Sequence, residues 1–178
     1  MRNRKHIVFY IVTALLLAFL QEAFFNDLRI FDVKPNLTLV FLCICATRMD
    51  YMEAIIYGAA TGVFVDIVYG RYIGIYGLLY LYFALLIVFI TKQTNYSEKI
   101  WWPIAVAPLP IIVYGILESF IIRLLSLYAG EAQVLYRYGY GTHFVQRILP
   151  VAFYNILCIA ILCVPVIKFL RKKKGAFE

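Results

Sequence analysis

Apolar residues form six continuous runs along the chain, separated by short polar segments. The runs cover about residues 7–25, 37–47, 52–69, 73–90, 100–127 and 148–170, and a tyrosine-rich outer connector occupies about 128–147. Runs of roughly 20 apolar residues are long enough to cross a bilayer as helices. They are continuous rather than alternating, which disfavours a membrane β-barrel. The pattern therefore predicts an all-α integral membrane protein with six transmembrane helices.

The second run, 37–47, is too short for an ordinary span. Its eleven residues make a helix of about 16 Å, roughly half the hydrocarbon thickness. We expect this helix to be extended by flanking residues, to cross half of the membrane, or to pack among other helices. Pro35 suits the first turn of such a helix, because the N–H that proline lacks is not needed there.

The fifth run begins at Trp101 and Trp102, which suit an anchor at the membrane–water interface. Pro103, Pro108 and Pro110 follow within its first turns. Because proline removes a backbone donor and clashes with the preceding turn, these residues predict a kinked start to the helix.

Composition agrees with this pattern and excludes a water-soluble globule. Of the 178 residues, 64% are hydrophobic and 15% are charged, and the mean hydropathy is +0.84. Six spans leave too little chain for a separate soluble domain, so we expect a single membrane domain over residues 1–178. The net charge of +7 does not indicate nucleic-acid binding, because basic residues in a membrane protein mark its cytoplasmic side.

Basic residues also predict the topology. If both termini lie inside, most of the 17 Lys and Arg residues are cytoplasmic, as the positive-inside rule requires. The first run follows a basic start, as a secretory signal does, but no small-residue cleavage site follows Leu20, so we expect an uncleaved first span. The basic tail also suits contact with anionic lipid or with a cytoplasmic partner. Its residues are Lys168, Arg171, Lys172, Lys173 and Lys174.

Small or acidic residues recur at every fourth position from the third run to the fourth. They are Gly58, Gly62, Asp66, Gly70 and Gly74. Residues four apart lie on the same face of a helix, so Gly58 and Gly62 form a groove that lets another helix approach closely. We interpret this face as a helix-packing seam or a partner seam.

Asp66 must face protein or water, because an unpaired carboxylate is costly inside a membrane. Three roles remain open for it: a hydrogen-bond acceptor that locks a helix pair or caps a neighbouring turn, a ligand-binding group, or a proton carrier. Glu118, inside the fifth run, is a candidate relay partner for the third role. A contact between Glu118 and Arg123 or a tyrosine is the simpler interpretation.

The sequence offers little for catalysis. Its two histidines are His6 and His143, and it contains no HExxH, CxxC or nucleophile-elbow motif. The four cysteines all lie inside apolar runs, where a thiol usually packs as a small hydrophobe. We therefore predict no enzyme activity, no cofactor and no metal site.

The outer connector contains Tyr136, Arg137, Tyr138 and Tyr140. Tyrosine and arginine are enriched at protein contacts, so these residues are candidates for contact with a partner outside the membrane. The alternative is an aromatic belt at the outer interface.

Two elements resemble the MreD family of bacterial rod-shape-determining proteins. They are Lys34-Pro35-Asn36-Leu37 at the start of the second run and the Gly-x3-Gly-x3-Asp-x3-Gly-x3-Gly spacing from Gly58 to Gly74. The resemblance implies a small inner-membrane scaffold of the cell-elongation machinery, which supports cell shape and peptidoglycan synthesis. It implies MreC as partner, together with RodA, its penicillin-binding transpeptidase and the actin-like MreB. It also implies a fold similar to the substrate-binding membrane subunits of energy-coupling-factor transporters.

That fold leaves a second interpretation, a small-molecule-binding membrane subunit of a transporter. Such a subunit needs polar or aromatic side chains that converge on a pocket, and the tyrosines between Tyr128 and Tyr140 could supply them. A scaffold would instead present the same side chains to a protein partner.

Overall fold

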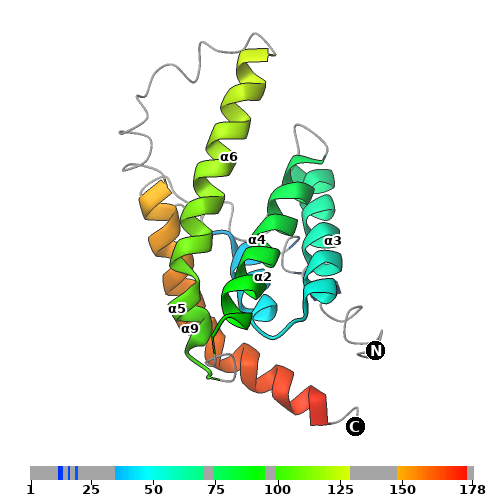
Figure 1. Cartoon of the computed structure of the whole chain (residues 1–178), viewed down its shortest axis with the longest axis vertical. Helices are drawn as coiled ribbons and strands as arrows, with labels where there is room; N and C mark the ends of the chain where they lie inside the picture. Colours follow the sequence, from blue (N-terminus) through cyan, green and yellow to red (C-terminus); the bar gives the residue numbers. More distant parts are fainter. Residues whose placement is uncertain are drawn as a thin grey trace.

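The membrane body combines long spanning helices with short, buried or broken ones. The computed structural model describes residues 35–69, 74–94, 99–128 and 148–175, together with Val12, Thr13, Leu16 and Phe19. The described helices are α2 (Leu37–Ala46), α3 (Tyr51–Tyr69), α4 (Ile75–Lys92), α5 (Trp102–Val106), α6 (Pro108–Tyr128) and α9 (Leu149–Gly175) (Figure 1). The expected all-α class is confirmed for this part of the chain.

Four of these helices, α3, α4, α6 and α9, are long and apolar enough to cross a membrane. Their spanning segments are Tyr51–Val68, Ile75–Lys92, Pro108–Leu125 and Leu149–Lys168. These four spans fit a multi-pass membrane protein. The first predicted run, 7–25, lies almost entirely outside the described residues.

The short helix α2 is buried at the centre of the bundle (Figure 1). It packs mainly against α9 and α4 and also touches α3. Its ten residues extend about 15 Å, and all side chains from residue 38 to 46 are buried. A helix that is apolar on every side needs neighbours on every side. Of the three expectations for the second run, the structure therefore shows the last: a short helix that is packed among other helices.

Helix α2 begins at Leu37 and is capped by Asn36, so Pro35 lies before it. Asn36 is the N-cap residue, and its Oδ1 accepts a hydrogen bond of 3.0 Å from the N–H of Leu39. Pro35 therefore precedes the helix, and its expected place in the first turn is wrong. The physical reason is that asparagine offers a side-chain acceptor to the unpaired N–H groups of the first turn, which proline cannot do.

Helices α3 and α4 form a hairpin, lie side by side in Figure 1, and make the most extensive contact between any two described helices. At the start of α3, Glu53 Oε2 accepts a hydrogen bond of 3.3 Å from the N–H of Asp50. Such a reach back to the preceding residue stabilises a helix start. The two helices occupy the predicted runs 52–69 and 73–90, with ends shifted by one or two residues.

The fifth run is divided into two helices. Ala107 separates α5 from α6, and Pro108 begins α6. The N–H of Ala107 still bonds to the carbonyl oxygen of Pro103 (3.1 Å), whereas Pro108 has no N–H to donate. Trp102 Nε1 donates to Thr91 Oγ1 (3.1 Å), which holds α5 against α4. The prolines therefore break the helix close to the place where a kink was expected.

Helix α9 contains Pro165 and changes direction in its C-terminal part (Figure 1). An internal proline removes one helical hydrogen bond and displaces the preceding turn, which explains the bend. The helix runs on to Gly175, beyond the predicted end at residue 170.

Helix α6 is the least covered of the four spans that the structure describes. Of the residues in its spanning segment 17% are buried, compared with 44% in the spanning segment of α4. Its C-terminal part extends beyond the other helices in Figure 1. Large apolar side chains along it are exposed, with Leu109 at 58% and Phe120 at 52%. This helix thus presents a long apolar surface to its surroundings.

Candidate functional site

The glycines of the predicted seam lie between α3 and α4. A Cβ atom at Gly58 would lie 2.8 Å from the carbonyl oxygen of Tyr80 and 3.0 Å from Leu81 Cα. A Cβ atom at Gly62 would lie 2.6 Å from Gly77 Cα. Real Cβ atoms do not approach backbone so closely, so larger residues would push the helices apart. The groove that these glycines form is therefore filled by the chain's own α4.

Asp66 caps the start of α4 from the end of α3. Its Oδ1 accepts a hydrogen bond of 3.0 Å from the N–H of Tyr76, and its Oδ2 accepts one of 2.8 Å from the N–H of Gly77. First-turn N–H groups form the positive end of the helix dipole, which favours a carboxylate there. Helix α4 uses this acceptor from outside because its own N-cap residue, Gly74, has no side chain.

The Asp66 side chain is only 1% exposed, and both of its carboxylate oxygens accept hydrogen bonds from α4. Charge-assisted bonds to two N–H groups offset the cost of burying the carboxylate. Of the three roles considered for Asp66, this geometry is that of the acceptor that caps a neighbouring turn and locks a helix pair. We call Gly58, Gly62, Asp66 and Gly77 the α3–α4 seam.

Gly74 lies outside the close helix contact. Its φ of +101° is in the left-handed region, and a Cβ there would meet nothing within 4 Å. Backbone conformation rather than helix packing therefore explains this glycine. Gly70 lies outside the described residues, and so do the connector residues Tyr136, Arg137, Tyr138 and Tyr140.

A polar junction ties the start of α2 to two other helices. The N–H of Asn36 donates to Asn155 Oδ1 on α9 (2.8 Å), and Asn36 Nδ2 donates to Tyr80 Oη on α4 (2.8 Å). Asn155 and Tyr80 are completely buried. We call Asn36, Tyr80 and Asn155 the polar junction. It joins three helices through the backbone N–H and the side chain of one residue, Asn36, whose side chain also caps α2.

Sequence reasoning missed the polar junction, although two signals for it are present. An asparagine directly before an apolar helical run is a typical N-cap. Asn155 is an amide inside the long sixth run, and an amide at that depth is expected to bond across to another helix. Tyr80 carries no such signal, because the chain has 15 tyrosines.

Charged side chains gather at one end of the described bundle. Lys92 Nζ forms an ion pair of 2.6 Å with Asp50 Oδ1, and Arg48 Nη2 donates to the carbonyl oxygen of Lys99 (2.9 Å). Lys99 Nζ lies 5.4 Å from the centre of the Trp101 ring. Basic side chains and a tryptophan at one level are typical of a membrane–water interface.

The described polar side chains join helices rather than gather around a metal. Among the described residues, no three His, Cys, Asp or Glu side chains are grouped so that they could hold a metal ion. The four cysteines are free, and Cys43 and Cys45 are fully buried in α2. Buried in this way, these two thiols pack as small apolar side chains.

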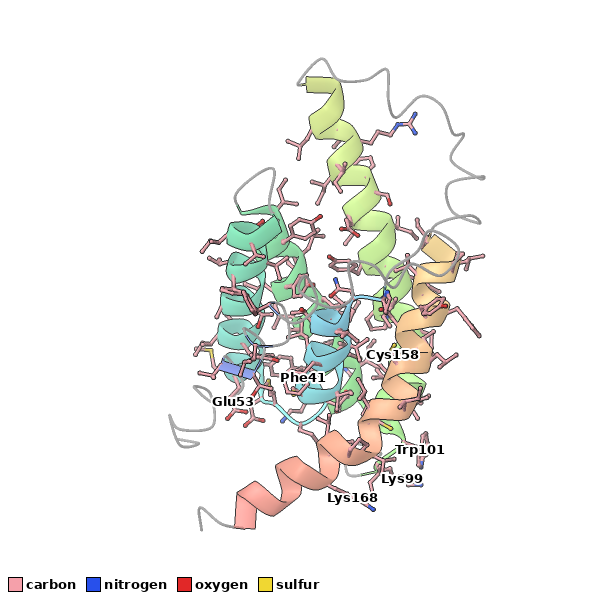
Figure 2. All side chains as sticks on the ribbon, turned by 180° about the vertical axis from the view of Figure 1, so that it is seen from behind. Phe41, Glu53, Lys99, Trp101, Cys158 and Lys168 are labelled. Carbon is pink, nitrogen blue, oxygen red and sulfur yellow. The ribbon has the colours of Figure 1, made fainter. Side chains whose placement is uncertain are left out.

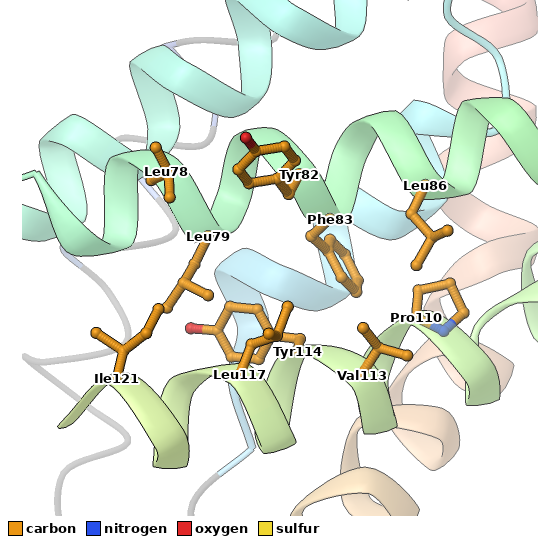
Figure 3. Close-up of a pocket in the computed structure, with 10 residues that line it drawn as sticks. All are labelled: Leu78, Leu79, Tyr82, Phe83, Leu86, Pro110, Val113, Tyr114, Leu117 and Ile121. Atoms are coloured by element: carbon orange, nitrogen blue, oxygen red, sulfur yellow. The ribbon is translucent and has the colours of Figure 1, made fainter. Parts of the chain in front are cut away.

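An apolar groove of about 400 Å³ lies between α4 and α6. Figure 3 shows side chains from the two helices converging on the space between them. Tyr114 packs edge-on against Tyr80 and Phe83, with ring centres 5.7 and 5.8 Å apart, which holds α6 against α4. This α4–α6 groove is lined by Leu78, Leu79, Tyr82, Phe83 and Leu86 of α4 and by Pro110, Val113, Tyr114, Leu117 and Ile121 of α6.

The family model for rod shape-determining protein MreD matches residues 3–173. This range includes the α3–α4 seam, the polar junction, the α4–α6 groove and nearly all of α9. No curated protein and no solved structure matches the chain. The match confirms the resemblance found in the sequence motifs. The chain therefore belongs to the MreD family, the inner-membrane proteins that determine rod shape and thereby act in peptidoglycan synthesis.

Proposed function

We propose that this chain is a non-catalytic scaffold of the cell-elongation complex and that it binds the bitopic membrane protein MreC. Together with MreC it supports RodA, its penicillin-binding transpeptidase and the actin-like MreB during wall synthesis. The observation that carries the proposal is the family match over nearly the whole chain. The geometry supports it, because Asp66 and the polar junction join helices to one another.

The scaffold is a single membrane domain over residues 1–178 with six transmembrane helices. Its fold is similar to that of the substrate-binding membrane subunits of energy-coupling-factor transporters. Four described helices of spanning length support this count, together with the buried helix α2 and the apolar run at 7–25. The outer connector, about 128–147, leads from α6 to α9.

Both termini of the scaffold lie in the cytoplasm. Arg48, Lys92 and Lys99 lie at the end of the bundle that carries Trp101, and Figure 2 shows Lys168 at the same end. The positive-inside rule assigns such an end to the cytoplasm. A reporter that is active only outside the membrane should be inactive when fused after residue 178, and an active fusion would reverse the orientation.

The α3–α4 seam keeps the scaffold rigid rather than receiving a partner. A partner helix would have to displace α4 in order to reach Gly58 and Gly62. We assign partner contact outside the membrane to Tyr136, Arg137, Tyr138 and Tyr140 of the outer connector, because these residue types are common in protein interfaces.

Co-expression with MreC tests the proposal. Extraction in mild detergent and purification through a tag on this chain should recover MreC in a constant ratio, whereas an unrelated bitopic protein expressed at the same level should be lost. Alanine at positions 136, 138 and 140 together should lower MreC recovery roughly tenfold or more, because buried interface tyrosines are often worth over 1 kcal/mol each. Equal recovery of MreC and the unrelated protein would contradict the scaffold.

A further inference from the structure

We propose that the last part of α9, residues 166–175, is turned along the membrane surface by the bend at Pro165 and binds anionic phospholipid headgroups there. We call this segment the basic arm. It carries five basic residues and no acidic one, namely Lys168, Arg171, Lys172, Lys173 and Lys174. The inference goes beyond the scaffold function and does not depend on it, because the ligand is the membrane in which the chain lies.

The arm begins where the hydrocarbon core ends. The spanning segment of α9, Leu149–Lys168, has 20 residues and is therefore about 30 Å long, which matches the thickness of the hydrocarbon core. Lys168 is exposed and lies at the same end of the bundle as Lys99 and Trp101 (Figure 2). Basic residues and tryptophan at one level are typical of the membrane–water interface. The basic residues that follow Lys168 therefore start from the level of the headgroups.

The bend at Pro165 keeps these basic residues close to the surface. After this proline α9 turns away from the direction of its spanning part and runs sideways at the end of the bundle (Figures 1 and 2). A straight helix would carry Lys174 about 9 Å beyond Lys168, and about one Debye length at physiological ionic strength is enough to screen its attraction to the surface. The bent arm instead keeps the backbone of these residues closer to the level of Lys168.

The root of the arm is fixed to the bundle. Ile167 is 1% exposed and belongs to the buried core, and Val166 packs against that core. The fold therefore sets the direction in which the arm leaves the span. A segment that is already oriented loses less conformational freedom on binding than an unstructured tail does.

Two features favour headgroups over an acidic protein as the ligand. Phe169 and Leu170 stand between Lys168 and Arg171, and apolar and basic residues side by side are typical of helices that lie in a membrane interface. The arm is also joined directly to a membrane span, so headgroups are always beside it at a high effective concentration. A soluble acidic protein must instead reach the arm by diffusion. Each Lys or Arg near an anionic surface strengthens the attraction about fivefold, so several in one arm give a stable contact.

Fluorescence quenching of the full chain in lipid nanodiscs tests the proposal without MreC. A fluorescent amino acid replaces Phe169, and acrylamide, a neutral quencher dissolved in water, measures how far the arm is exposed to water. Discs with about one third phosphatidylglycerol should give at least about threefold weaker quenching than discs of phosphatidylcholine alone. Salt at about 1 M should remove most of this difference, because it screens charge. The same probe in place of Trp101 is the control and should be quenched equally in both kinds of disc.

Two variants separate the charge of the arm from its direction. Glutamine at positions 171–174 removes most of the charge, so quenching should become equal in the two kinds of disc. Pro165→Ala keeps every charge and restores a helical hydrogen bond, so the arm should straighten and lose about half of its protection or more. Pro165 is exposed, so this substitution should leave the packing of α9 intact. Lys92→Gln is the matched control, because Lys92 pairs with Asp50 at the same end of the bundle, and it should leave the protection of the arm unchanged.

Equal quenching of the parent chain in both kinds of disc would overturn the proposal, and so would full protection in either arm variant. An acidic cytoplasmic protein is the alternative ligand. It would replace the headgroups if the arm stayed exposed in anionic discs while a photoactivatable residue at position 169 gave adducts with a protein, and not with lipid, in cells. Because the disc measurements contain no MreC, their failure would leave the scaffold function standing, and loss of MreC binding would leave the arm's lipid contact standing.

Discussion

In the α3–α4 hairpin, glycines bring two backbones into contact and a carboxylate on one helix caps the start of the other. Along α6, large apolar side chains project from a helix of which only 17% of the spanning segment is buried. The hairpin helices and α6 are all apolar and of spanning length, so hydropathy alone does not distinguish them. Their difference lies in residue size and in hydrogen bonding.

This difference indicates which surfaces are complete within the chain. Lipid tails are as apolar as leucine, so hydrophobicity does not drive membrane helices together, and close packing and hydrogen bonds must do so. The described hairpin has both, whereas most of the α6 spanning segment is exposed. Substitutions in the hairpin should therefore damage folding, and substitutions on α6 should affect assembly while leaving the folded chain intact.

The largest effect is expected from Gly62→Leu. Even a Cβ atom at this position would lie 2.6 Å from Gly77 Cα, so the helices must separate. We expect this to lower the free energy of unfolding by about 3 kcal/mol or more. Membrane accumulation, measured by immunoblotting of fractions, should fall severalfold. Ile67→Leu, at a position 73% exposed on the same helix, should accumulate normally. Equal accumulation of the two variants would remove the contrast between hairpin and α6.

Substitution of Asp66 should have the next largest effect and should be graded. Asp66→Leu leaves the N–H groups of Tyr76 and Gly77 without acceptors, which costs about 1–3 kcal/mol for each. Asp66→Asn keeps one acceptor oxygen, so its loss of unfolding free energy should be about half as large. Unfolding in mild detergent by a denaturing detergent would measure both. If Asn proves as damaging as Leu while both variants insert, a charge-dependent role such as proton transfer becomes the better explanation.

A smaller effect is expected from Tyr80→Phe, which removes the acceptor for Asn36 Nδ2. The lost bond should lower the free energy of unfolding by about 1 kcal/mol. Tyr82→Phe, at a position 55% exposed on the same helix, is the control and should change it by less than about 0.5 kcal/mol. The same unfolding titration separates the two, and equal values would mean that the bond between Asn36 and the Tyr80 hydroxyl contributes nothing to stability.

The smallest effect on stability is expected from Phe120→Ala on α6. Phe120 is 52% exposed, so its removal should change the free energy of unfolding by less than about 0.5 kcal/mol. A loss of several kcal/mol in the isolated chain would show that α6 is already packed, and the comparison with the hairpin would fail.

Much of the helical layout could be predicted from the sequence. The ends of α3 and α4 lie within two residues of the predicted runs, because long apolar stretches in a bilayer have few alternatives to helix. The prolines at 103, 108 and 110 marked the broken start of the fifth run, since proline acts on the local backbone. Local chemistry was therefore sufficient where the cause lay within one or two turns.

The contacts of the candidate site could not be predicted in this way. The need for a partner for Asp66 was evident, but the partners are backbone N–H groups, and every residue other than proline carries one. The bond between Asn36 and Asn155 joins positions 119 residues apart. Such pairings depend on how the helices fold back on each other, which no local pattern in one sequence records.

The buried helix α2 has a consequence for the order of biosynthesis. A segment of ten apolar residues is about half the length needed to partition into a bilayer as an independent span, so it must wait for neighbours. Its first hydrogen bond to α9 joins residues 119 positions apart, and at about 5–20 residues per second the ribosome needs roughly 6–24 s to make that interval. During this time α2 can pack only against helices that are made before α9, such as α3 and α4. A chain truncated before α9 should therefore expose α2 to membrane quality-control proteases, and release of the complete chain closes the bundle around it.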